Sequence, residues 1–425
     1  MRQRMVMIFF MKRFLWVIGA CLVILILDYS LKPNPAVQEK LRTFTAHKAR
    51  NIISLRSQSN FSQMPSVSYK KVTERPSRST LNNKRIPKEV NKINKLAFNR
   101  GFPVWNEETS TSLLTSLLKK VWINYLSMNK YNVTFNFKKK AVKLSREELL
   151  CELKSKLYPV KMLTLADGFP VGKDKHDDWK SYLPTKPFKD VFGKLKRCAV
   201  VSSAGSLRWS GLGREIDEHD AVLRFNAAPT SARFIRDVGS KTSIRFINSQ
   251  VVSTEAHRFL TDPLYRDTVL VMWDPAPYSK NITHWFNNPD YSFFDKYKEY
   301  RIKNPNQFFY VMNPSFQWDL WDIIQDNSDD NIQKNPPSSG IQGIILMMSL
   351  CEEVNVYEFL PSRRKTDVCH YYQSFQDRAC IVGAYHPLLY EKNLIKRINS
   401  GSDNDIYYYG KAVLKGFESF DCANT

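Results

Sequence analysis

Residues 198–226 read CAVVSSAGSLRWSGLGREIDEHDAVLRFN, and this stretch decides the fold. Two short apolar runs, CAVVSS from Cys198 and AVLRFN from Ala221, flank a segment of glycine, serine and charged residues. Short runs that are apolar almost throughout are typical of strands buried on both faces of a sheet. The pattern returns in SIRFIN from residue 243, TVLVMW from 268, FFYVM from 308 and VNVYEF from 354.

Helical patterns lie between the later runs. WDLWDIIQDN from Trp318 and GIQGIILMMSLCEEV from Gly340 have the spacing of apolar residues that a helix requires. Strands that alternate with helices predict an α/β fold with a mostly parallel central sheet flanked by helices. A further helical pattern over residues 109–128 marks the start of the folded body.

Short polar residues stand where three of the predicted strands end. Ser202 and Ser203 follow the first strand, Asn226 ends the second and Asn248 ends the third. In open parallel sheets, ligands bind beyond the carboxyl ends of the strands. These hydroxyls and amides therefore predict a site that can hold the polar groups of a sugar or a base.

A second candidate site stands before the helix predicted from Gly340. NPPSSG at residues 335–340 places Ser338 and Ser339 at the amino end of that helix. Two hydroxyls, unpaired backbone N–H groups and the helix dipole can bind a phosphate-sized anion. Ordinary N-capping by one of the two serines is the alternative interpretation.

The amino terminus predicts a membrane anchor. A basic tail, residues 1–13, precedes FLWVIGACLVILILDYSL at residues 14–31, whose only charge is Asp28. At 1.5 Å per residue this segment reaches about 27 Å, enough to span a thin bilayer. No small-x-small cleavage site follows it, and the positive charges keep the amino end cytoplasmic. We expect a retained type II signal anchor, with all later residues in the lumen of the secretory pathway.

The chain carries a formal net charge of +22, which first raises the question of nucleic-acid binding. Residues 32–120 hold 18 Lys and Arg against 5 Asp and Glu, whereas residues 121–425 hold 41 against 35. The excess charge therefore belongs to a polar segment, residues 32–105, which we interpret as a flexible stem before a folded domain at 106–425. Because this segment is expected in the lumen, nucleic acid is not an expected partner.

Sequons and cysteines agree with a lumenal domain. The glycosylation sequons begin at Asn60, Asn132 and Asn281. Six cysteines follow the apolar segment: Cys151, Cys198, Cys351, Cys369, Cys380 and Cys422. They allow three disulfides, in a pairing that spacing alone does not resolve.

Motifs for metal binding and for dinucleotide binding are weak in this sequence. The chain has no C-x2-C pair, and GLGREI from Gly211 lacks the third glycine of a dinucleotide fingerprint. Asp403 and Asp405 have the D-x-D spacing of divalent-metal sites, but they lie in a Gly-Ser segment that we expect to be a solvated turn. We therefore expect no metal and no other cofactor.

Four segments, taken together, resemble the motifs of animal sialyltransferases, in the order found in that family. They are CAVVSSAGSLRWSGLGREIDEHDAVLRFNAAPT from Cys198, NPPSSGIQGIILMMSLCEEVNVYEFLPS from Asn335, HYYQ from His370 and HPLLYE from His386. The similarity covers roughly residues 125–422. The segment PSRRKTDVCHYYQ and the later GAYHPLLYEKN most resemble the β-galactoside α-2,6-sialyltransferases.

The resemblance implies a Golgi enzyme with a Rossmann-like fold of the variant GT-A type. Its implied reaction transfers sialic acid from CMP-sialic acid to the 6-hydroxyl of a terminal galactose on glycoprotein N-glycans, with inversion and without a metal. A sialyltransferase of another linkage or acceptor (α-2,3 or GalNAc-directed) is the first alternative. A glycan-binding protein that keeps the fold without turnover is the second.

The resemblance also implies roles for individual residues. Implied donor contacts are Ser203, Asn226, Asn248, Ser338, Ser339, Gly340, His370, Tyr385 and Lys392. Implied acceptor contacts are Tyr131, Gln250, Asp290 and Gln373. His370 stands where close relatives often have tyrosine. This exchange affects individual contacts to the donor and not the expected reaction.

His386 is the implied catalytic base. A sugar hydroxyl is a poor nucleophile at neutral pH, and an imidazole that takes its proton contributes roughly 10²–10⁴-fold in rate. A core histidine flanked by aromatic residues is the alternative interpretation.

The implied disulfides are Cys198 with Cys351, Cys369 with Cys380, and Cys151 with Cys422. The sequence leaves open whether the chain forms a homodimer, whether cleavage of the stem releases a soluble form, and which glycoproteins are acceptors.

Overall fold

The computed structural model describes residues 104–112, 114, 117–118, 130–131, 133, 143–164, 179–275, 281–377, 379–383 and 385–422. All of them belong to one compact unit, Pro87–Thr425. The expected tail and anchor, nearly all of the expected stem, and Asn60 and Asn132 lie outside the described residues. Within the described part of the chain, no helix is long and apolar enough to cross a membrane.

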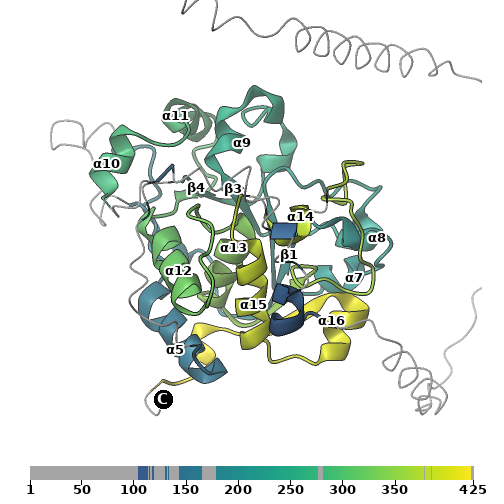
Figure 1. Cartoon of the computed structure of the whole chain (residues 1–425). Coiled ribbons are helices and arrows are strands. Elements are labelled where there is room, and N and C mark those ends of the chain that lie inside the picture. The colour runs from purple at the N-terminus through teal and green to yellow at the C-terminus, as the bar shows by residue number, and fades with distance from the viewer. Residues whose placement is uncertain are drawn as a thin grey trace, which may run out of the picture. The chain divides into compact units, whose positions relative to one another are not determined.

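The described residues form a seven-stranded sheet in the order β5-β4-β3-β2-β1-β6-β7 (Figure 1). The strands are β1 Leu195–Val201, β2 Ala221–Phe225, β3 Ile244–Asn248, β4 Val269–Trp273, β5 Phe309–Val311, β6 Cys351–Tyr357 and β7 Lys411–Lys415. Neighbours from β5 to β6 pair in parallel, and β7 pairs with β6 antiparallel. The predicted α/β class with a mostly parallel sheet is confirmed.

The strand predicted from VNVYEF at residue 354 begins earlier than expected. The helical pattern from Gly340 was expected to continue to residue 354, but the helix ends at Met348 and β6 begins at Cys351. Cys351 is the register partner of Leu195 in β1, so pairing with the central strand extends β6 at its amino end. Tertiary pairing here overrides the local helical pattern.

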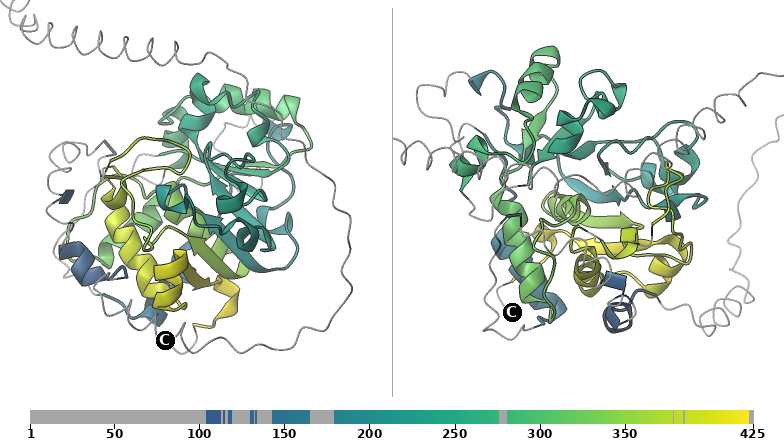
Figure 2. Two further views of the ribbon diagram at one scale, coloured as in Figure 1. Left: turned by 90° about the vertical axis from the view of Figure 1, so that its right-hand side faces the viewer. Right: turned by 45° about the horizontal axis from the view of Figure 1, so that its top comes forward.

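Alternate residues of a strand face opposite sides of the sheet. Both faces carry apolar side chains here, and a layer of helices covers each of them. Cys198 and Val200 of β1 pack into one apolar cluster, and Ala199 and Val201 pack into the other. The larger cluster contains apolar residues of α5 Arg146–Leu157, α12 Ser315–Asp326, α13 Ser339–Met348 and α15 Leu388–Ile398. The smaller cluster contains residues of α7 Gly213–Asp217 and α8 Ile235–Val238 (Figure 2).

The shorter helices lie between strands or near the carboxyl terminus. They are α9 Ser249–Ser253, α10 Ile282–Asn287, α11 Phe294–Lys303, α14 Ala379–Val382 and α16 Asp403–Tyr409. Asn281, whose sequon lies within the described residues, is exposed and its side-chain oxygen caps α10.

α13 packs closely on the middle of the sheet. A Cβ atom added at Gly343 would lie 2.6 Å from a ring carbon of Phe225, so only glycine allows this approach. Its other neighbours along the helix are almost all apolar and buried. The amino end of α13 is thereby held in place beside the ends of the central strands.

Two arginines interrupt the apolar strands. Arg224 in β2 and Arg245 in β3 are register partners, and each is 1% exposed. Burial lowers the pKa of both guanidinium groups to about 10. Arg224 donates to the carbonyls of Val238 and Lys241, and these bonds offset part of the cost of burying the charge.

Three disulfides join Cys151 to Cys422, Cys198 to Cys351 and Cys369 to Cys380, which are the same pairs that the resemblance implies. The second one links β1 to β6. The strand order changes direction between these two strands, and crevices at such switch points are where ligands bind.

The segment around Asp403 differs from its expected structure. It is the first turn of α16 and not a solvated turn, because Ser402 and Asp405 form a capping box at its amino end. Asp403 forms an ion pair with Lys396. Among the described residues, no cluster of His, Cys, Asp and Glu has a geometry that could hold a metal ion.

Candidate active site

Two asparagines at adjacent strand ends fix each other. Asn226 has a φ of 47°, a left-handed conformation that asparagine tolerates. Its side-chain oxygen accepts from the backbone N–H of Asn248 at 3.0 Å, and its carbonyl accepts from Arg245 at 2.9 Å. The side-chain oxygen of Asn248 accepts from Val251 at 3.2 Å. The oxygens are thus engaged, and the two side-chain Nδ2 groups are the donors that can meet a ligand.

The residues expected from HYYQ lie beside the end of β1. The carbonyl of Ser203 accepts from the N–H of Tyr371 at 3.0 Å, and Ala204 forms an isolated bridge with His370. His370 stacks on Tyr372, and its Nδ1 lies 2.6 Å from Oε1 of Gln373. The structure therefore brings Ser203, His370 and Gln373 together, with Gln373 exposed.

The amino end of α13 is tied to α15 by a buried carboxylate. Oε1 of Glu391 accepts from the N–H of Ser338 at 2.7 Å, and Oε2 accepts from the Ser338 hydroxyl at 2.5 Å. Ser338 also caps the helix, since its hydroxyl oxygen accepts from Ile341. The polar atoms of Ser338 are therefore used within the protein, although Ser338, Ser339 and Gly340 are all partly exposed.

Glu391 and its neighbour Lys392 are both buried. Burial raises the pKa of the Glu391 carboxyl, while the bonds from Ser338 oppose the rise. Burial lowers the pKa of the Lys392 ammonium group, and the charge of Glu391 opposes the change. Lys392 donates to the carbonyl of Ile381 at 3.0 Å and lies 5.4 Å above the ring of Phe359.

His386 lies directly in front of this helix end. Its Nδ1 is 2.7 Å from the carbonyl oxygen of Pro336. A carbonyl only accepts, so Nδ1 carries the hydrogen and Nε2 of the neutral ring is left to accept a proton. Burial lowers the pKa of His386, while the bond to Pro336 opposes the shift, so the ring stays neutral near pH 7.

Trp273 joins His386 to α13. Its indole N–H donates to the hydroxyl of Ser339 at 2.9 Å, and its ring centroid lies 6.4 Å from that of His386. The ring of Tyr385 packs edge-on against His386 on another side, at 4.9 Å. These contacts orient the imidazole beside the helix terminus.

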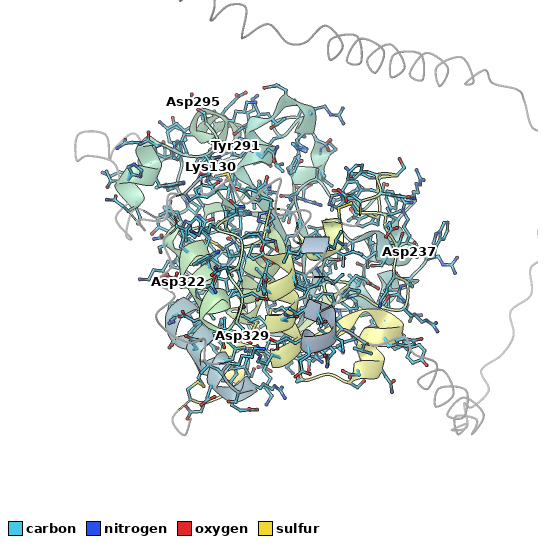
Figure 3. All side chains as sticks on the ribbon, viewed as in Figure 1. Lys130, Asp237, Tyr291, Asp295, Asp322 and Asp329 are labelled. Carbon is cyan, nitrogen blue, oxygen red and sulfur yellow. A yellow bond between two sulfur atoms is a disulfide. The ribbon has the colours of Figure 1, made fainter. Side chains whose placement is uncertain are left out.

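The expected acceptor residues Tyr131 and Asp290 lie near Tyr385. The hydroxyls of Tyr131 and Tyr385 are 3.0 Å apart. Burial raises the pKa of Tyr385 to about 12, and it raises the pKa of Tyr131 further, with Tyr385 and Asp290 adding to the rise. Asp290 forms an ion pair with Lys130, and Figure 3 shows Lys130 beside Tyr291, the residue that follows Asp290.

Gln250 is exposed in α9, directly after Asn248 and Ser249. Among the described residues, the side chain of Gln250 forms no hydrogen bond with Tyr131, Asp290 or Gln373. The structure therefore places Gln250 at the strand ends without fixing its orientation.

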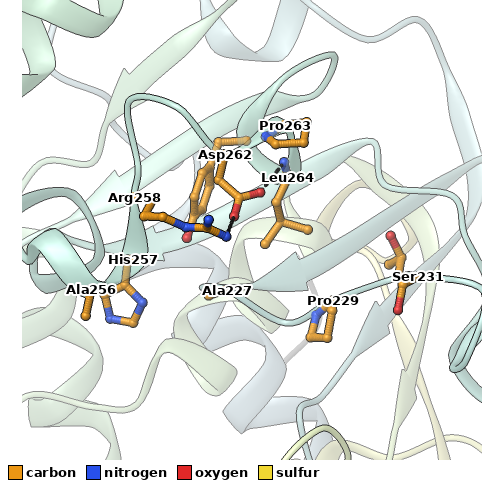
Figure 4. A pocket seen from close by; sticks show the side chains of 11 residues that line it. Ala227, Pro229, Ser231, Ala256, His257, Arg258, Asp262, Pro263 and Leu264 are labelled. Carbon is orange, nitrogen blue, oxygen red and sulfur yellow. Dashed lines mark hydrogen bonds and ion pairs between the residues drawn. The ribbon is translucent and has the colours of Figure 1, made fainter. Parts of the chain in front are cut away.

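A cavity of about 440 Å³ begins directly after Asn226 and is lined by residues 227–231 and 256–265 in part (Figure 4). Arg258 and Asp262 form an ion pair on its wall. It contains none of the expected donor or acceptor residues. We assign it no part in the reaction.

Two residues of the site were not among the sequence predictions. Glu391 lies inside the quoted HPLLYE segment, so the motif itself was the signal that could have identified it. Asp274 directly follows β4, and the rule that selected Asn226 and Asn248 would have selected it as well. Its buried carboxylate accepts from the backbone of Asp290 at 2.9 Å.

The fold and the site define a class of protein. Strand ends with amide donors, a helix terminus and a neutral histidine meet at one edge of a parallel sheet, an arrangement compatible with group transfer. The family model described as glycosyltransferase family 29 (sialyltransferase) matches residues 171–402, more than half of the chain. This chain therefore belongs to the sialyltransferases of glycosyltransferase family 29 and is a glycosyltransferase.

Curated relatives agree with this assignment. Human "Beta-galactoside alpha-2,6-sialyltransferase 1" is 54% identical over 76% of this chain and 77% of its own length. The mouse protein of the same name is 48% identical over 88% of this chain and 93% of its own. A solved structure, "Crystal Structure of a Mammalian Sialyltransferase", aligns with a TM-score of 0.37 at 20% identity over 62% of this chain and 87% of its own. The fold assignment rests on the strand order and register described above.

Proposed function

We propose that this chain transfers sialic acid from CMP-sialic acid to the 6-hydroxyl of a terminal β-galactose on a glycoprotein glycan. The names and the identity of the human and mouse relatives support this linkage and acceptor. The observation that carries the proposal is the position of His386, whose Nδ1 is bonded to Pro336 so that Nε2 can act as base.

The reaction is a single displacement. The acceptor oxygen forms a bond to the anomeric carbon of sialic acid as the bond from that carbon to the CMP phosphate oxygen breaks. Nε2 of His386 takes the proton of the attacking hydroxyl, and CMP leaves with the electron pair of the broken bond. Attack from the face opposite CMP inverts the anomeric centre.

The end of α13 can match the charge of the leaving phosphate. N–H groups at a helix terminus and the hydroxyl of Ser339 are suited to an anion with one phosphate. Asn226 and Asn248 present amide N–H groups from the strand ends. This donor set supports a metal-independent reaction, in which protein groups alone stabilise the leaving group.

The acceptor is proposed to lie between His386 and the residues Tyr131 and Asp290. A carboxylate and a phenol hydroxyl can hydrogen-bond to the hydroxyls of galactose. We further propose a Golgi location with a type II anchor, supported by the apolar segment 14–31 and by three disulfides, which persist in oxidising compartments.

The test uses the full chain in detergent with CMP-sialic acid, an N-acetyllactosamine-terminated acceptor and EDTA, and NMR reads the product linkage. A 2,6-linked product formed in EDTA is the expected result. A 2,3-linked product would overturn the acceptor assignment while keeping the donor. Absence of transfer by folded protein would favour a glycan-binding role.

A further inference from the structure

A buried side chain, Asp274, attaches the loop that carries Asp290 to the sheet. Asp274 directly follows Trp273, the last residue of β4, and is 2% exposed. Its Oδ2 accepts from the N–H of Asp290 at 2.9 Å and from the indole of Trp285 at 2.8 Å. Its Oδ1 accepts from the N–H of Tyr291 at 3.3 Å. One carboxylate therefore fixes two consecutive backbone groups of the loop.

We propose that Asp274 is a positioning residue for the acceptor, because it fixes Asp290 relative to the base His386. The inference rests on the proposed function, in which Asp290 contacts the acceptor sugar. Asp274 itself is buried and is not proposed to touch either substrate.

The neighbouring residue in the chain connects this carboxylate to the base. Trp273 packs near His386 and donates to Ser339, whereas Asp274 holds the loop. The backbone at this point is fixed as well, since the carbonyl of Asp274 accepts from the buried Gln317 at 2.9 Å. Two consecutive residues at one strand end thus set the distance between the base and the acceptor loop.

The aromatic residues around the loop fix where it packs, but they do not fix the positions of its backbone N–H groups. Trp285 lies 6.1 Å from Phe293 and 5.7 Å from Phe294 between ring centroids. Such ring contacts are apolar and tolerate small shifts, whereas three N–H groups converging on one carboxylate do not. We therefore expect the loop to stay folded but to lose its exact position when the carboxylate is replaced by an amide.

Asp274→Asn tests this proposal. An amide has one acceptor oxygen, so its NH₂ group would face an N–H donor of the loop. In the full chain in detergent, we expect the KM for the acceptor to rise about tenfold, the effect of one lost hydrogen bond to a charged group. We expect the KM for CMP-sialic acid and the rate of donor hydrolysis by water to stay within about twofold, because neither needs the acceptor loop.

Asp237→Asn is the matched control. Asp237 is also buried, and its carboxylate accepts from the N–H groups of Trp209 and Gly211 at 2.9 and 3.0 Å. Figure 3 shows it far from Lys130 and Tyr291. This variant should lower the melting temperature without changing the acceptor KM.

Two further variants separate the possible failures. Trp285→Phe keeps an aromatic ring but removes the N–H donor to Asp274, and it should raise the acceptor KM if Asp274→Asn does not fold. An unchanged acceptor KM in the folded Asp274→Asn or Trp285→Phe variant, or an equal loss of transfer and donor hydrolysis, would overturn the positioning role alone. An unchanged acceptor KM in Asp290→Asn would overturn the acceptor site itself.

Discussion

The donor side and the acceptor side of this site are built differently. On the donor side, Asn226, Asn248 and Ser338 are held by hydrogen bonds that begin at strand ends or at a helix cap. On the acceptor side, Asp290 forms an ion pair with Lys130, whose side chain is 55% exposed. The core of the fold therefore fixes the donor side, whereas the acceptor side depends on loops attached to that core. Changes to the first should affect catalysis or donor use, and changes to the second should affect acceptor binding.

His386→Ala gives the largest expected effect. Without the imidazole, no group at this position takes the proton of the acceptor hydroxyl, and we expect transfer to slow by roughly 10²–10⁴-fold. The binding of CMP, measured by calorimetry, should change little because the donor groups remain. His257→Ala, which changes a histidine that lines the cavity of Figure 4, is the matched control and should transfer at the wild-type rate. Residual activity near wild type in His386→Ala would remove the histidine from the mechanism.

Glu391→Gln gives the next largest expected effect. The variant loses one of two hydrogen bonds from Ser338 to a buried carboxylate, a change of about 1.5–3 kcal/mol that corresponds to roughly 10–100-fold in kcat/KM for the donor. If Glu391 acts through Ser338, the Ser338→Ala and Glu391→Gln changes should not add in a double-mutant cycle. Additive losses would show that the carboxylate acts independently of the helix cap.

Lys130→Met should have a smaller effect, on the acceptor side only. The side chain of Lys130 is 55% exposed, whereas that of Asp290 is 10% exposed. Ion pairs with a solvent-exposed lysine contribute about 0–1 kcal/mol, or less than about fivefold in acceptor KM. The difference from wild type should disappear in 1 M NaCl, where charges are screened within about 3 Å. Lys143→Met, which removes an exposed lysine paired with Glu107 and Asp329, is the control and should leave the acceptor KM unchanged. A change in donor KM in Lys130→Met would contradict the division between the two sides.

The pH dependence is the finest test. Burial lowers the pKa of His386 below the ordinary value of about 6.5, and the base acts in its neutral form. The rate should therefore hold as pH falls to about 6.5 and decrease only as pH passes through the lower pKa of the folded protein. An acidic limb of kcat/KM above pH 6.5 would contradict a neutral base with a lowered pKa. Donor hydrolysis measured over the same range reports any limb that belongs to the donor side.

The sequence predicts the donor side better than the acceptor side, for a physical reason. Asn226 and Asn248 end apolar runs, so a local pattern places them at one sheet edge. Their left-handed or capping conformations are tertiary details that no local pattern contains. β7 was not predicted, because KAVLK is a short edge strand with lysine at both ends.

The remaining contacts join residues that are distant in the chain. Tyr131 meets Tyr385 across 254 residues, and Ser338 meets Glu391 across 53. Neither periodicity nor spacing can pair such residues. The family resemblance supplied Tyr131, Tyr385 and Ser338, but not Glu391, and not which polar atoms are used within the protein, as those of Ser338 are.

The arginine pair of β2 and β3 has a consequence for how the chain reaches this fold. In a parallel sheet with apolar runs on every strand, neighbouring strands could align one residue out of step at little apolar cost. Such a slip would turn the guanidinium of Arg224 or Arg245 toward the opposite face, away from the carbonyls of Val238 and Ala228 that accept from them. A buried charge without acceptors is strongly unfavourable. The two arginines thus favour the observed alignment of β2 and β3 over a slipped one, which would leave a buried charge unpaired.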